Sequence, residues 1–269
     1  MSEQPERNLL PAFQLLKNAV AYTYNERRDF ILLAQIPVIF LTFAALLSHS
    51  LFPEPPLVVD EAGAVISFNP GFLPLQILQY LLYSMFAVAW IRKTLIAESN
   101  ITILAALSWN KYKTSFLMRM VQIFGICLAM IFAVMAVLYL FSSMTSLSAT
   151  PIMFMIALAI LTLGYGRLAL CLPAAAIGDQ LNIKECYDKT GGNSWRLASL
   201  FILPAMAGLI ILMLLSELLS PLLNMAAEDN RMIAVAIHSF LFYVLDYIGV
   251  AITASALSHA YIDLIKTDT

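Results

Sequence analysis

Six apolar segments recur along the chain, and short polar stretches separate them. A helix needs about 20 apolar residues to cross the hydrocarbon core of a bilayer, and each segment reaches about that length. The segments are Phe30 to Phe52, Phe72 to Ile91, Phe116 to Phe141, Pro151 to Leu172, Leu197 to Leu215 and Met232 to Leu257. The pattern predicts an all-α membrane protein with six transmembrane helices.

The lysines and arginines lie almost entirely on one side of the six predicted helices. Thirteen of the 15 basic residues precede the first helix or follow the second, fourth or sixth. The exceptions are Arg167, inside the fourth helix, and Arg231, in a loop on the opposite side. Loops rich in lysine and arginine stay in the cytoplasm. Because an even number of spans leaves both ends on one side, we predict that both termini are cytoplasmic.

A short semi-polar segment with helical spacing precedes each odd-numbered span. In the first, the apolar positions are Leu9, Phe13, Leu16 and Val20, and residues 103–107 and 183–187 repeat the arrangement. We expect all three to lie as amphipathic helices at the cytoplasmic interface. The chain is then a single integral membrane domain, 1–269, made of three helical hairpin units at about 9–98, 99–179 and 180–266. The units run in the same direction, unlike the inverted repeats of many transporters.

Composition and motifs exclude several function classes. Hydrophobic residues make up 61% of the chain and charged residues 12%, so lipid is the main solvent. A net charge of −2 provides no basic face for nucleic acid. The sequence shows no catalytic triad, phosphate-binding loop or set of metal ligands, and we expect no enzyme activity, cofactor or metal. Cys127, Cys171 and Cys186 show no CxxC spacing, and we expect no disulfide framework.

Two ionisable residues, Arg167 and Asp246, lie inside the predicted spans. Counted from the outer ends of their spans, both lie at depths of roughly 21 to 24 Å. Because a single charge in lipid is costly, we expect the two to pair, directly or through water. The pair is either a salt bridge that locks helices together or part of an ion or substrate path. In a third alternative, Arg167 extends to the nearby inner boundary.

The most specific motif is Gly166 to Gly178, which contains Arg167-Leu168 and Pro173-Ala174-Ala175, followed by Thr190 to Leu197 (TGGNSWRL). It resembles the uncharacterised bacterial inner-membrane proteins of the YciC type, which are similar to the membrane domain fused to glycerophosphodiester phosphodiesterases. The resemblance implies a six-helix domain in the bacterial inner membrane and no particular substrate. The soluble catalytic domain of those phosphodiesterases has no counterpart here. At Gly191-Gly192 the chain departs from the family pattern, in which a basic residue often precedes the glycine.

We therefore expect a non-catalytic inner-membrane protein that acts in envelope integrity or as a lipid-facing scaffold. Membrane lipids are its expected partners. The cytoplasmic loops carry basic and aromatic residues, and the candidates for contact with anionic lipid head groups are Lys111, Lys113 and Arg196.

Two other functions stay open. The first is a transporter of small molecules or lipids with a path near Arg167 and Asp246. The second is a membrane enzyme acting on lipid. It would need polar side chains to converge at the inner interface, where the sequence offers Asp179, Glu185 and Asp188.

Overall fold

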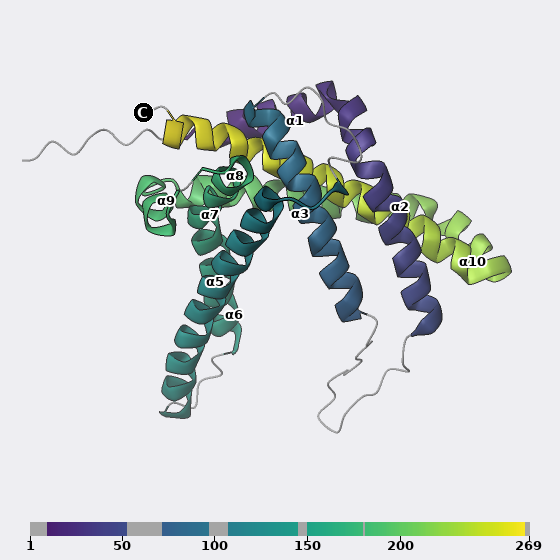
Figure 1. The fold of residues 1–269 in the computed structure, drawn as a ribbon. Helices are drawn as coiled ribbons and strands as arrows, with labels where there is room; N and C mark the ends of the chain where they lie inside the picture. The colour runs from purple at the N-terminus through teal and green to yellow at the C-terminus, as the bar shows by residue number, and fades with distance from the viewer. Residues whose placement is uncertain (1–9, 53–71, 97–106, 145–149, 180, 267–269) are drawn as a thin grey trace, which may run out of the picture.

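The computed structural model describes residues 10–52, 72–96, 107–144, 150–179 and 181–266, and every regular element in these ranges is helical (Figure 1). The α-helices are α1 (Ala12–Asn25), α2 (Arg27–Leu51), α3 (Phe72–Ile96), α5 (Lys111–Met144), α6 (Thr150–Ala159), α7 (Tyr165–Leu168), α8 (Cys171–Ile177), α9 (Ile183–Lys189) and α10 (Ser194–Tyr261). The π-helical turns are η1 (Ile160–Gly164) and η2 (Ile262–Lys266). The predicted all-α class is confirmed.

Six helical stretches are long and apolar enough to cross a membrane, which confirms the predicted number. They are Arg27–Leu51, Leu73–Ile96, Lys111–Tyr139, Met155–Ile177, Ser194–Pro221 and Met232–Lys266. Several begin or end beyond the apolar segment seen in the sequence. A helix keeps its backbone hydrogen bonds outside the hydrocarbon core, so polar flanks such as Arg27 and Lys111 still belong to helices.

The fourth span is a broken helix. α6 passes into the π turn η1, α7 follows, and a gap of two residues separates α7 from α8. Pro173 explains the break, because proline has no N–H to donate to the carbonyl of Ala169 four residues earlier. That carbonyl accepts from the N–H of Leu172 instead, at 3.0 Å. α8 then ends at Gly178, whose φ of 83° is left-handed, as glycine allows.

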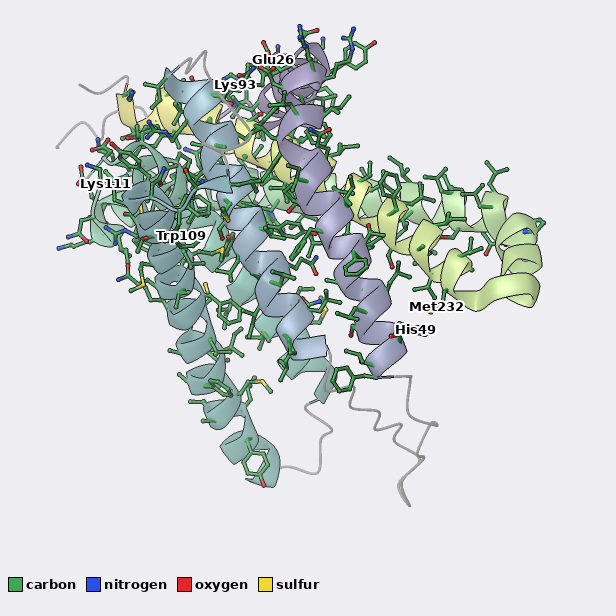
Figure 2. The ribbon with its side chains drawn as sticks, turned by 45° about the vertical axis from the view of Figure 1, so that its right-hand side comes forward. Glu26, His49, Lys93, Trp109, Lys111 and Met232 are labelled. Atoms are coloured by element: carbon green, nitrogen blue, oxygen red, sulfur yellow. A yellow bond between two sulfur atoms is a disulfide. The ribbon has the colours of Figure 1, made fainter. Side chains whose placement is uncertain are left out.

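α10 is helical throughout and yet reverses direction. At 1.5 Å per residue, a straight helix would separate Leu200 and Thr253 by about 80 Å. Instead, the Thr253 hydroxyl donates a hydrogen bond to the Leu200 carbonyl at 3.5 Å. The fifth and sixth spans therefore form a hairpin, which turns back at the right of Figure 2 between Pro221 and Met232. The outer loop expected between these spans is helical in its backbone.

Three hairpins diverge from a common end of the molecule (Figure 1). They consist of α2 with α3, α5 with α6, and the two halves of α10. Buried residues concentrate at the common end, and examples are Trp90 and Ile91 in α3, Leu170 before α8, and Leu197 and Leu200 in α10. Many large apolar side chains farther along the hairpins are exposed, which suits contact with lipid.

Short helices lie before the first and fifth spans, as predicted. The second expected interfacial helix falls outside the described residues, except for Leu107. In α1, the buried residues Leu15 and Ala19 lie on the side that packs on α10, whereas Phe13 of the predicted apolar stripe is 81% exposed. The predicted stripe is thus not the buried face of α1, and Phe13, Leu16 and Val20 line a groove beside α10 instead.

Polar contacts between distant segments hold the common end together. The ammonium group of Lys93 in α3 lies 2.7 Å from the Glu26 carboxylate and also pairs with Asp29 in α2. Figure 2 shows Lys93 beside Glu26. The indole N–H of Trp90 donates to the hydroxyl of Ser255 in α10 at 2.8 Å, and both side chains are buried. The Lys93 contacts join the two helices of the first hairpin, and the Trp90 bond ties that hairpin to the third.

Candidate functional site

Arg167 projects from α7, near the common end of the hairpins. Its neighbour Gly166 lets α7 approach α10 closely, because a Cβ there would lie 2.9 Å from the backbone nitrogen of Ala198. The π turn η1 changes the helical register just before α7. In this position Arg167 faces α9, which folds back after the end of α8.

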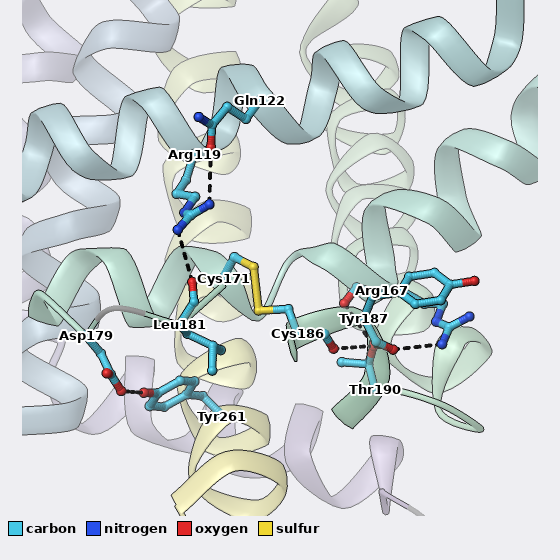
Figure 3. Close-up of a disulfide and its surroundings, with 10 residues drawn as sticks. All are labelled: Arg119, Gln122, Arg167, Cys171, Asp179, Leu181, Cys186, Tyr187, Thr190 and Tyr261. Atoms are coloured by element: carbon cyan, nitrogen blue, oxygen red, sulfur yellow. Dashed lines mark hydrogen bonds between the residues drawn. A yellow bond between two sulfur atoms is a disulfide. The ribbon is translucent and has the colours of Figure 1, made fainter. Parts of the chain in front are cut away.

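The guanidinium group of Arg167 lies against Tyr187 of α9 (Figure 3). Its Nη2 donates to the Tyr187 carbonyl oxygen at 2.8 Å, and its Cζ lies 3.4 Å from the centre of the Tyr187 ring. The buried Nε has no hydrogen-bond partner, and no carboxylate within the described ranges pairs with Arg167. Since an arginine has five N–H donors, the group keeps donors for a further acceptor.

A groove of about 680 Å³ lies beside this guanidinium group, and we call it the Arg167 groove. α5, α6, η1 and α9 supply most of its walls. Apolar side chains dominate the lining, among them Ile126, Met130, Ile156, Ile160 and Leu163. Arg167, Lys184 and Tyr187 also line it. The groove therefore combines a long apolar surface with two cations.

Asp246 lies in the sixth span and contacts the first hairpin. Its Oδ2 accepts a hydrogen bond from the Tyr83 hydroxyl and another from Nε2 of Gln79, at 3.3 Å. The same Gln79 nitrogen lies 2.7 Å from the Tyr83 oxygen. Both donors are neutral, so within the described part of the chain no cation balances the carboxylate charge of Asp246.

A cavity of about 360 Å³ borders Asp246, and we call it the central cavity. Residues of α3, α5, α7, α8 and both halves of α10 line it. Its aromatic lining residues are Tyr80, Tyr83, Phe116, Tyr165 and Phe201. The central cavity and the Arg167 groove have no lining residue in common.

Arg167 and Asp246 form no direct ion pair in the described structure, and the predicted direct pairing is wrong. Arg167 contacts Tyr187 beside one cavity, whereas Asp246 accepts hydrogen bonds from Tyr83 and Gln79 beside another. Depth along a helix was the basis of the prediction, but depth does not determine the direction in which a side chain points around its helix. Each group has polar neighbours of its own, which lower the cost of its charge without an ion pair.

The three predicted head-group contacts do not form one site. Lys113 is buried, with its ammonium group donating to the Ser108 carbonyl, so it does not fit the predicted role. Lys111 is exposed, with its nitrogen 5.1 Å from the centre of the Tyr112 ring, and Arg196 reaches Asn193 Oδ1 at 3.5 Å. Lys111 and Arg196 begin different helices and stay separate predictions.

Cys171 and Cys186 form a disulfide between α8 and α9, with Cα atoms 6.1 Å apart (Figure 3). The expectation of no disulfide is therefore wrong. Spacing in the sequence gave no hint, because the turn after α8 brings together cysteines that are 15 residues apart. Both cysteines are buried, and Cys127 is free and buried.

Residues of the family-like motif make structural contacts near Arg167. The Thr190 hydroxyl lies 3.1 Å from the Arg167 carbonyl oxygen and 2.8 Å from that of Cys186. Asn193 is buried, and its Oδ1 accepts from the backbone N–H of Leu10 at 3.0 Å. The motif thus joins α7, α9 and α10 to the start of α1.

The three carboxylates considered for catalysis differ from one another in their surroundings. Asp179 accepts a hydrogen bond from the Tyr261 hydroxyl (Figure 3), whereas Glu185 and Asp188 are exposed on α9. Across the described ranges, no group of three or more His, Cys, Asp or Glu side chains is arranged to hold a metal ion. Arg167 and Asp246, each beside its own cavity, are the candidate functional residues.

Comparison of the chain with protein-family models, curated proteins and solved structures finds no match. The resemblance to the YciC type stays a prediction. We therefore infer function from the groove, the central cavity and the charges beside them.

Proposed function

We propose that this chain is a non-catalytic, multi-pass protein of the bacterial inner membrane that holds an anionic phospholipid in the Arg167 groove. In this role it acts as a lipid-facing scaffold that supports envelope integrity. The observation that carries the proposal is the Arg167 guanidinium group, which borders a mostly apolar groove and whose one described hydrogen bond goes to the Tyr187 carbonyl.

The chemistry of the groove fits a phospholipid. Apolar side chains of α5, α6 and η1 offer a surface for an acyl chain, while Arg167 and Lys184 offer positive charge to a phosphate. Arginine binds phosphate through two parallel hydrogen bonds. Tyr187, which also lines the groove, holds the guanidinium group in place, so little side-chain entropy is lost on binding.

The proposed orientation supports a lipid of the inner leaflet. Thirteen of the 15 basic residues flank the spans on the side of the predicted termini, so both termini are cytoplasmic in this proposal. Arg167 lies in the half of the fourth span that is nearer this side. The cytoplasmic leaflet carries the anionic lipids that attract such residues.

Native mass spectrometry of the protein in nanodiscs tests the lipid proposal. In discs of equal phosphatidylglycerol and phosphatidylcholine, we expect the protein to retain phosphatidylglycerol. Arg167→Gln and Lys184→Gln should each reduce that retention. Lys189→Gln removes the same charge from the same helix outside the groove, so it should have no effect.

Lys184→Gln should disturb folding least, because Lys184 is exposed and makes no described hydrogen bond or ion pair. Equal retention of both lipids by the unaltered protein, or phosphatidylglycerol retention that survives both groove variants, would refute the proposal. For the envelope role, loss of the gene should raise detergent sensitivity, and the Arg167→Gln variant should restore resistance less well than the unaltered protein.

The transporter alternative loses its expected path, because Arg167 and Asp246 border separate cavities. The enzyme alternative has no converging set of the predicted carboxylates to support it.

A further inference from the structure

The central cavity carries a charge that the proposed lipid role does not use. Asp246 is the one charged residue among the described residues that line it. The side chain receives hydrogen bonds only from the neutral groups of Tyr83 and Gln79. These bonds lower the cost of the buried carboxylate but leave its negative charge unbalanced, so the cavity favours an occupant with positive charge.

The aromatic lining of the cavity also favours a positively charged occupant. Five rings line the cavity, from Tyr80, Tyr83, Phe116, Tyr165 and Phe201. The face of an aromatic ring carries partial negative charge and attracts cations, most strongly where water is excluded. Rings and a carboxylate together form the chemistry that recognises ammonium groups with apolar substituents.

A metal ion fits this cavity poorly. Hard divalent cations take six to eight oxygen ligands. The one carboxylate of the described lining is Asp246, and the hydroxyl groups of Ser84 and Thr253 already donate to backbone carbonyls within α3 and α10. Most of the remaining lining is aliphatic or aromatic. An organic cation suits this surface better, because its substituents remain in apolar contact.

Small residues leave room for a ligand around Asp246. A second groove, of about 250 Å³ between the two halves of α10, also borders Asp246, and it shares Ala205 and Gly249 with the central cavity. A Cβ at Gly249 would have no atom within 4 Å, so this position faces open space. The central cavity, at about 360 Å³, falls in the range of about 300 to 1,000 Å³ that is typical of ligand pockets.

We propose that the central cavity binds an apolar organic cation, such as a small amine or quaternary ammonium compound, with Asp246 as its counter-ion and the aromatic rings as its walls. This site is independent of the lipid role, because the groove and the cavity share no lining residue.

Binding of radiolabelled benzyltrimethylammonium to the full chain in nanodiscs tests the proposal. We expect saturable binding at one site per chain, corrected for empty discs. Asp246→Asn keeps the size of the side chain and removes its charge, so it should weaken binding by about tenfold or more. Arg167→Gln removes a charge beside the other cavity and should leave this binding unchanged.

A second variant keeps the test valid if Asp246→Asn fails to fold. Gly249→Leu retains the carboxylate and fills the open space, so it should abolish binding while the protein keeps its thermal stability. Neopentylbenzene, which has carbon in place of the charged nitrogen, should compete poorly. Equal competition by this neutral compound, or unchanged binding in folded Asp246→Asn or Gly249→Leu, would overturn the proposal.

Discussion

The hydroxyl group of Tyr83 donates a hydrogen bond to the carboxylate of Asp246, 163 residues farther along the chain. The bond joins the first hairpin to the third beside the central cavity. Because the acceptor is charged, it is stronger than a bond between two neutral groups. Asp246 thus contributes to the packing of the bundle as well as to the negative charge of the cavity.

Tyr83→Phe should lower the free energy of unfolding by about 1 to 3 kcal/mol, because it removes a donor from a carboxylate inside the bundle. Steric trapping in bicelles measures this quantity. Tyr80→Phe is the matched control, since the Tyr80 hydroxyl on the same helix makes no described hydrogen bond and should change stability little. Equal losses in the two variants would show that the bond to Asp246 contributes nothing.

Gly166→Ala should separate α7 from α10. The added Cβ would lie 2.9 Å from the nitrogen and 3.2 Å from the Cα of Ala198, and backbone atoms cannot move aside as a side chain can. Such overpacking typically costs about 1 to 3 kcal/mol of stability. Thermal unfolding in detergent measures the loss. Gly125→Ala, where nothing lies within 4 Å of the added atom, should be neutral or stabilising.

Ser255→Ala should destabilise the common end of the hairpins. It leaves the buried indole N–H of Trp90 without its acceptor, which costs about 1 to 3 kcal/mol. Ser258→Ala is a control in the same helix, because the Ser258 hydroxyl bonds only to the carbonyl of Ala254 one turn earlier. If both serine variants unfold at the same temperature as the unaltered protein, the bond to Trp90 is without effect.

From the disulfide we predict how many cysteines react with an alkylating reagent. After acid quenching and denaturation without reductant, alkylation followed by mass spectrometry should label Cys127 alone. Reduction should then expose Cys171 and Cys186. Replacement of both by alanine should cost up to about 3 kcal/mol, the value for closing a loop of 15 residues. Three labelled cysteines before reduction would exclude the bond.

Much of the fold follows from the hydropathy of the sequence. Apolar length predicted all six spans, and the start of the second at Phe72 agrees with α3. The helices before the first and fifth spans were also predictable, because α1 and α9 alternate apolar and polar residues at helical spacing. These features depend on local sequence and on the thickness of a bilayer.

The candidate sites were less predictable, because they depend on contacts between distant segments. Hydropathy places Arg167 and Asp246 at similar depths but says nothing of their neighbours. The break at Pro173 and the turn at Gly178 direct α9 back onto α7, which brings Tyr187 against Arg167 and Cys186 against Cys171. The proline and the glycine are visible in the sequence, but the path that follows them is not.

The three hairpins join tightly at one end and diverge at the other. With this arrangement, we expect the shape of the protein to depend on the thickness of the membrane. Helices accommodate a thinner bilayer by tilting farther from its normal. Most buried residues lie at the joined end. A change in the tilt of the hairpins should therefore change the spacing between one hairpin and the next. Because residues of all three hairpins line the central cavity, we expect the acyl chain length of the host membrane to change its shape.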